Sequence, residues 1–171
     1  MWKAFFPNAR IHGIDIDPAC AAHAGEGVDV WIGDQADRAF LEHVAKEAGG
    51  FDLVIDDGGH TMTQQNVAFE TLFPHVRDGG IYVLEDLGTS YWPRFGGGPK
   101  KRHTCIEMLK GLVDVIHRPH LRHKWAKRKR IDAPPDFLES HVSSLHFYNS
   151  MCFVYKRGHA FNPQSCDRLT L

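Results

Sequence analysis

The sequence predicts an α/β fold, a doubly wound parallel sheet with helices on both faces. Three observations predict it: short apolar runs alternate with amphipathic segments, glycine-containing turns separate them, and acidic residues follow the apolar runs. The chain has 171 residues, of which 43% are hydrophobic, and its formal net charge is -1. A chain of this length and composition can bury its own core, so we expect a single domain over residues 1–171.

The first half of the chain is expected to alternate strands with helices. Apolar residues recur at helical spacing before Gly49 and Gly50, which end that helix. The run that follows is almost wholly apolar, as expected for a strand covered on both faces. The expected elements are the strand Ile11–Ile16, a helix opening at Pro18–His23, the strand Val28–Ile32, the helix Asp37–Ala48 and the strand Phe51–Ile55.

The second half continues the alternation and then changes character. Its last apolar segment is interrupted by Asn149 and Ser150, which favours a C-terminal antiparallel hairpin. The glycine run at 96–98 is expected to be a mobile surface loop. The expected elements are the helix Thr63–Val76, a turn at Asp78–Gly80, the strand Ile81–Leu84, the helix Cys105–Ile116 and the hairpin Val142–Tyr155.

Composition also limits the cellular context. No apolar stretch approaches the roughly 20 residues that span a bilayer, and the N-terminus lacks the features of a secretory signal. The cysteines are scattered without a C-x-x-C pair, so we expect free thiols and a cytoplasmic location. They are Cys20, Cys105, Cys152 and Cys166.

Acidic residues follow four successive predicted strands. In parallel sheets ligands bind beyond the carboxyl ends of the strands, so these acids are the candidate functional residues. An acid after the first strand can accept hydrogen bonds from ribose hydroxyls, although the acids there can also simply cap the next helix. The acids are Asp15, Asp17, Asp34, Asp56, Asp57, Glu85 and Asp86.

Three of these acids form a candidate metal site. Asp57, Glu85 and Asp86 follow adjacent strands, and such oxygen ligands without cysteine suit Mg²⁺, Mn²⁺ or Ca²⁺. Turn hydrogen bonds are the plainer explanation of paired acids. Repulsion among the carboxylates nevertheless favours a cation between them. His60 follows two glycines at the same edge and is the candidate general base.

The segments FDLVIDDGGH and FPHVRDGGIYVLEDLGTSYW resemble the metal-dependent class I S-adenosylmethionine O-methyltransferases of the macrolide-sugar, mycinamicin-type family. The resemblance implies a Rossmann-like fold and transfer of a methyl group to a sugar hydroxyl of a glycosylated natural product, with S-adenosylmethionine and Mg²⁺ or Mn²⁺ as cofactors. It also implies residue roles: Asp57, Glu85 and Asp86 bind the metal, His60 is the base, Asp15 binds the cofactor ribose, Asp34 and Gln35 lie near the adenine, and Asp56 lies near the methionine part.

The chain departs from this family at its start. The family's first strand and glycine-rich turn, of the type E/D-x-G-x-G, have no counterpart in MWKAFFPNARIHGIDID. We therefore expect an N-terminally truncated sheet that lacks this strand and loop. An inactive remnant or assembly partner is the alternative that follows from this departure.

Two further segments invite functional interpretations. Residues 117–130 hold seven Lys/Arg and three His without an acid, which is typical of a solvated loop and, less often, of an RNA-binding module. The segment Leu87–Gly98 carries Tyr91, Trp92 and Phe95 and is expected to close as an aromatic lid over a glycoside. We expect a small-molecule glycoside as partner, no membrane, and no nucleic acid; a homo-oligomer stays open.

Overall fold

The computed structural model describes residues 2–129 and 136–158, and it describes side chains within these ranges except at 119–129. The described chain contains six strands and five α-helices, which alternate strictly from β2 to α4, and four short 3-10 turns. The helices are α1 (Trp2–Phe5), α2 (Arg38–Ala48), α3 (Met62–Leu72), α4 (Cys105–Lys129) and α5 (Phe137–His141). The alternation confirms the expected α/β class.

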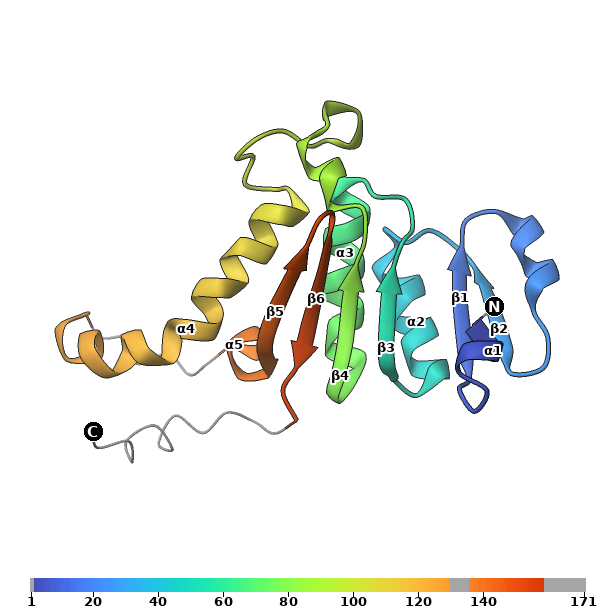
Figure 1. The fold of residues 1–171 in the computed structure, drawn as a ribbon, viewed down its shortest axis with the longest axis horizontal. Coiled ribbons are helices and arrows are strands. Elements are labelled where there is room, and N and C mark those ends of the chain that lie inside the picture. Colours follow the sequence, from blue (N-terminus) through green and yellow to red (C-terminus); the bar gives the residue numbers. More distant parts are fainter. Residues whose placement is uncertain (1, 130–135, 159–171) are drawn as a thin grey trace.

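The strands form two sheets. Strands β1 (Ile11–Asp15) and β2 (Val28–Ile32) pair in parallel. The second sheet has the order β3-β4-β6-β5, with β3 parallel to β4 and the hairpin β5–β6 antiparallel. Its strands are β3 (Phe51–Asp56), β4 (Val76–Leu84), β5 (Val142–Tyr148) and β6 (Met151–Lys156). Within the described residues, β1 and β3 are neighbours in the row of strands without being paired (Figure 1).

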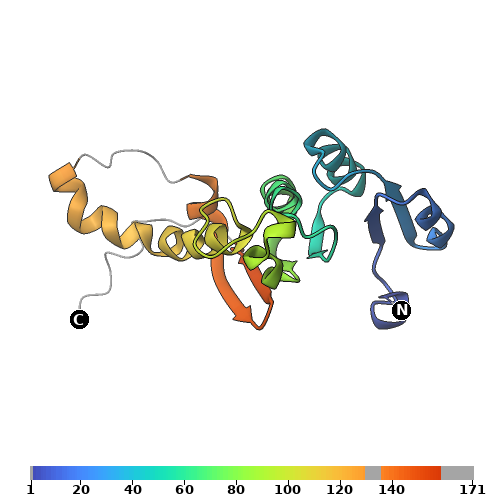
Figure 2. The same cartoon turned by 90° about the horizontal axis from the view of Figure 1, so that it is seen from above.

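Helices α2 and α3 lie behind the strands, and the short α1 lies in front of them (Figures 1 and 2). The core forms where α3 packs on β4, because Tyr82 and Leu84 point to this side and are fully buried. Phe69 stacks on Phe73 with ring centroids 5.0 Å apart and meets the Tyr82 ring edge-on at 5.2 Å. This aromatic cluster holds the end of β4, where the candidate metal acids lie, against α3.

Strand β4 begins earlier than the sequence predicted. Residues 76–80, which were read as the end of a helix and a glycine turn, are instead the start of the strand; α3 ends at Leu72, and Phe73–His75 forms a tight turn before β4. Phe51 pairs with Val76 whereas Leu53 pairs with Ile81, so β4 carries a bulge between these pairs. The glycines that looked like a turn accommodate this bulge: a side chain at Gly80 would lie 2.7 Å from the Asp52 carbonyl oxygen.

Two other expectations were wrong. Strand β3 is not covered on both faces, because Leu53 in its middle is 39% exposed. The basic segment is not a loop up to Lys129, because α4 continues to that residue. Its side chains beyond Arg118 lie outside the described ones, so the RNA-binding interpretation stays untested. Among the described residues, no helix combines the length and apolar character needed to span a membrane.

Candidate metal and cofactor site

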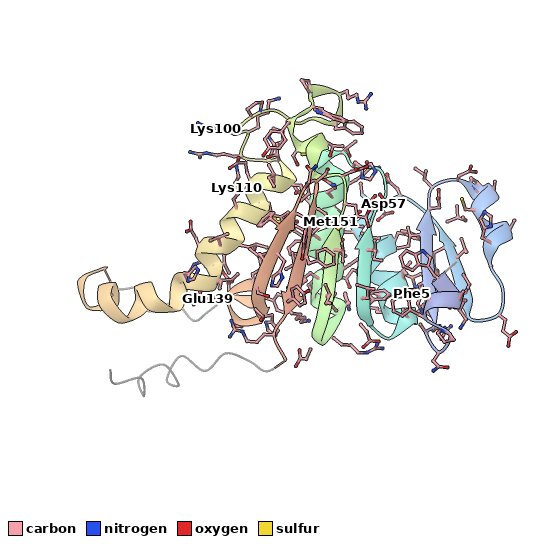
Figure 3. The ribbon with its side chains drawn as sticks, in the orientation of Figure 1. Phe5, Asp57, Lys100, Lys110, Glu139 and Met151 are labelled. Atoms are coloured by element: carbon pink, nitrogen blue, oxygen red, sulfur yellow. The ribbon has the colours of Figure 1, made fainter. Side chains whose placement is uncertain are left out.

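The site lies at the carboxyl ends of β3 and β4. The two strands pair in parallel, and the Glu85 amide donates to the Asp56 carbonyl oxygen at 3.0 Å. This pairing places the acids that follow both strands at one edge of the sheet. Asp57 lies there, at the tip of β3, and Met151 begins β6 nearby (Figure 3).

Three side chains converge at this edge. One ligand atom from each of Asp57, His60 and Asp86 lies within 4.8 Å of the others. His60 Nε2 is 3.3 Å from Asp86 Oδ2 and 3.9 Å from Asp57 Oδ1. The imidazole is 18% exposed, whereas the two carboxylates are 61% and 59% exposed. The imidazole therefore forms the inner wall of the cluster, and both carboxylates open to solvent.

Backbone conformation brings these side chains together at some cost. His60 and Asp86 both adopt left-handed conformations, with φ of 57° and 51°. Such values are uncommon outside glycine and concentrate at functional sites. After His60 the chain enters α3 through a capping box formed by Thr61 and Gln64. The cap fixes the start of α3, and with it the direction from which His60 reaches the acids.

Glu85 borders the cluster without belonging to the tightest group. Burial raises the pKa of its carboxyl, and repulsion from Asp57 and Asp86 raises it further. A divalent cation between the carboxylates would relieve this repulsion. The donors are mainly carboxylate oxygens, which Mg²⁺ and Mn²⁺ prefer. The residues present therefore fit a hard divalent cation.

Asp56 is the last residue of β3, directly before Asp57, and it is buried. Gln35 Nε2 donates to its Oδ1 at 2.5 Å, and the Tyr82 hydroxyl donates to its Oδ2 at 3.2 Å. Burial raises the pKa of this carboxyl from its ordinary 3.8 to about 6, although both hydrogen bonds act in the opposite direction. Asp56 therefore belongs to an internal polar network. Its expected contact with the methionine part of a cofactor is untested.

The raised pKa of Asp56 predicts a pH-dependent stability. The folded state keeps the proton up to about pH 6, whereas the unfolded state loses it near 3.8. As the pH rises from about 4 to about 6, the protein therefore becomes less stable. Above pH 6 this group lowers the free energy of unfolding by on the order of 3 kcal/mol relative to its value in acid. Urea titrations in EDTA at pH 4 and pH 7 should show Asp56→Asn gaining stability relative to wild type as the pH rises. An equal difference at both values would contradict this prediction.

The expected ribose and adenine residues lie after β1 and β2. Asp15 is exposed; its Oδ1 accepts from the Asp17 amide at 2.8 Å, which lowers the pKa of its carboxyl, and Cys20 contributes a second hydrogen bond. Asp34 accepts from the Ala36 amide at 2.7 Å. Asp17 has the plainer role considered for these acids, because it caps the turn beginning at Pro18. Asp15 and Asp34 are thus exposed residues that are held by hydrogen bonds within their own turns.

The aromatic segment after Asp86 is folded back on itself. Hydrogen bonds join the Gly97 amide to the Trp92 carbonyl oxygen and the Gly98 amide to that of Ser90. Tyr91 and Trp92 remain 46% and 49% exposed. The Arg94 guanidinium lies over the Trp92 ring, 5.2 Å from its centroid. These hydrogen bonds fold the segment 87–98 into an aromatic ledge on which Tyr91 and Trp92 are exposed; the mobility expected of its glycine run stays a prediction.

Sequence reasoning missed two residues that support the site. Gln65 is fully buried and donates to the Glu85 carbonyl oxygen at 3.0 Å, while Tyr82 bonds Asp56 from within β4. Each lies in a segment of helical or strand periodicity, where a polar residue at a core position was the only available signal.

The sequence and the fold of this chain are similar to those of known methyltransferases. A family model described as a methyltransferase domain matches residues 3–87. Mycinamicin VI 2''-O-methyltransferase of Micromonospora griseorubida and demethylmacrocin O-methyltransferase of Streptomyces fradiae are each 39% identical to this chain over 160 residues, 91% of it. The MycE methyltransferase of the mycinamycin biosynthetic pathway, solved in complex with Mg and SAH, superposes with a TM-score of 0.82 at 39% identity. The chain spans 38% of the length of these two curated relatives and 39% of that solved chain.

Proposed function

We propose that this chain, whose residues 3–87 match a methyltransferase domain, forms the metal- and cofactor-binding part of an S-adenosylmethionine-dependent, Mg²⁺-dependent O-methyltransferase. Its acceptor is a sugar hydroxyl of a glycosylated natural product such as a macrolide, as the names of the relatives indicate for those proteins. The observation that carries the proposal is the convergence of Asp57, His60 and Asp86 at the ends of β3 and β4.

The proposed roles follow from the chemistry of the side chains. Asp57 and Asp86 hold the cation, and Glu85 completes the oxygen ligands from the next position on the sheet edge. When bound, Mg²⁺ lowers the pKa of a coordinated sugar hydroxyl and orients it. In this proposal Asp15 binds the cofactor ribose, Asp34 and Gln35 lie near its adenine, and Asp56 lies near its methionine part.

His60 is the proposed general base. An imidazole nitrogen is a poorer ligand for Mg²⁺ than a carboxylate oxygen, so His60 stays free to exchange a proton. The acceptor hydroxyl gives its proton to Nε2, its oxygen forms a bond to the methyl carbon, and the carbon–sulfur bond breaks. The products are a methyl ether, S-adenosylhomocysteine and a protonated His60.

The test is transfer of a labelled methyl group. The chain is incubated with S-adenosylmethionine labelled in its methyl group, with a macrolide glycoside that carries free sugar hydroxyls, and with Mg²⁺ or EDTA. The labelled methyl group should pass to the glycoside in the presence of Mg²⁺ and should not pass in the presence of EDTA. If the folded chain binds neither S-adenosylmethionine nor Mg²⁺, the proposal is contradicted and the alternative of an inactive remnant is favoured.

The aromatic ledge supports a contact with the acceptor. Trp92 lies six residues beyond Asp86, and its ring offers a large apolar face at low entropic cost. Trp92→Ala should raise the KM, or the Kd measured by calorimetry, for a macrolide glycoside about tenfold, with little change in metal affinity. Trp2→Ala is the matched control, because Trp2 is 46% exposed on α1. Equal effects of the two variants would indicate that Trp92 does not contact the acceptor.

The remaining expectations stay predictions. They concern a cytoplasmic location, a possible homo-oligomer and the absence of a nucleic-acid partner. Sizing by light scattering measures the second directly.

A further inference from the structure

Gln35 has contacts that a cofactor-binding role does not require. It follows β2, yet its side chain reaches across to the end of β3, in the other sheet. Its Nε2 donates to Asp56 Oδ1 at 2.5 Å, and its Oε1 accepts from the Gly59 amide at 2.9 Å. Both ends of the amide are therefore engaged by the segment that carries Asp57 and His60.

The contact with this segment is close. A Cβ atom at Gly58 would lie 2.2 Å from Gln35 Oε1, and a Cβ at Gly59 would lie 2.2 Å from Gln64 Oε1. The turn 58–59 thus lies between two glutamine side chains, and Gln35 is the one that bonds it. His60 comes directly after it in a left-handed conformation, which surrounding contacts must maintain.

We infer that Gln35 is a positioning residue for His60 and Asp57, and that it ties the β1–β2 sheet to the metal cluster through Gly59. This inference rests on the proposed function, since it concerns the residues that hold the metal and remove the proton. Groups that orient ligands in this way typically change metal affinity by 10- to 100-fold when removed.

Two variants remove the contact by different routes. Gln35→Met keeps the length of the side chain without its amide. Gly58→Ala does not change residue 35 itself. The added methyl group instead pushes away the amide of Gln35, which is the flexible end of that side chain. Arg38→Met is the matched control, because Arg38 begins α2 three residues later and bonds Glu70 and Thr71 instead.

Two readouts separate this inference from the proposed function. We expect both variants to lower Mn²⁺ affinity about tenfold in calorimetry, with the control at wild-type affinity. We also expect faster hydrogen exchange at the Gly59 amide and a changed His60 imidazole resonance, both measured by NMR without metal. Unchanged exchange and an unchanged resonance in folded Gln35→Met would overturn the inference. If the wild type binds no Mn²⁺, the proposed function fails, and the NMR readouts alone decide the positioning role.

Discussion

Removing either central carboxylate abolishes tight metal binding in our account. Asp57→Asn and Asp86→Asn each keep the shape of the side chain and remove one negative charge from a cluster whose ligand atoms lie within 4.8 Å of one another. Asparagine also tolerates the left-handed backbone of position 86, where φ is 51°, so the variant is expected to fold. Mn²⁺ affinity in calorimetry should fall by about 100-fold or more, which corresponds to about 2.7 kcal/mol.

The control for these variants is Asp114→Asn, which removes an exposed acid from α4. It changes the net charge equally and should leave Mn²⁺ affinity at the wild-type value. The same loss in all three variants would indicate general charge attraction rather than ligation. Glu85 can be tested in the same series. Because its carboxyl has a raised pKa, Mn²⁺ binding in acidic solution should release a proton from it.

Loss of the imidazole at position 60 should separate turnover from binding. His60→Asn removes the proposed base and suits a φ of 57°, whereas alanine would add backbone strain. General bases contribute about 10²- to 10⁴-fold to rate, so kcat for methyl transfer should fall by that factor with little change in KM. Mn²⁺ affinity should change much less than in Asp86→Asn, because His60 is not a ligand in this account.

The control for this prediction is His75→Asn. His75 lies away from the cluster and pairs with Glu42, with Nε2 2.9 Å from Oε2. It should keep wild-type kcat. A His60→Asn variant with unchanged turnover would refute the base assignment, and one that loses metal as completely as Asp86→Asn would make His60 a ligand instead.

The sequence predicted the parts of the site that depend on strand ends. Parallel pairing of β3 and β4 follows from their apolar runs, and it brings Asp57 and Asp86 to one edge whatever the rest of the chain does. His60 was predictable because the glycines at 58 and 59 leave room for a tight turn. The family resemblance then supplied the division of roles between these residues.

Other parts depend on contacts between distant segments, which carry no local signal. The bulge in β4 was read as a turn, because two adjacent glycines favour a turn and a bulge alike. Only the pairing of β4 with Phe51 and Leu53 distinguishes the two. The bridge from Gln35 to Gly59 spans 24 residues between two sheets. The exposure of Leu53 shows that one face of β3 is left partly uncovered, which the apolar run of this strand does not indicate.

The location of a bound cation in crystals of the chain grown with Mn²⁺ tests directly whether Asp57 and Asp86 bind the metal. Anomalous diffraction at the manganese edge should give one strong peak in contact with carboxylate oxygens of Asp57 and Asp86, at the end of β3 and β4. Absence of a peak there at millimolar Mn²⁺, or a peak ligated elsewhere, would contradict the metal-dependent account of this site.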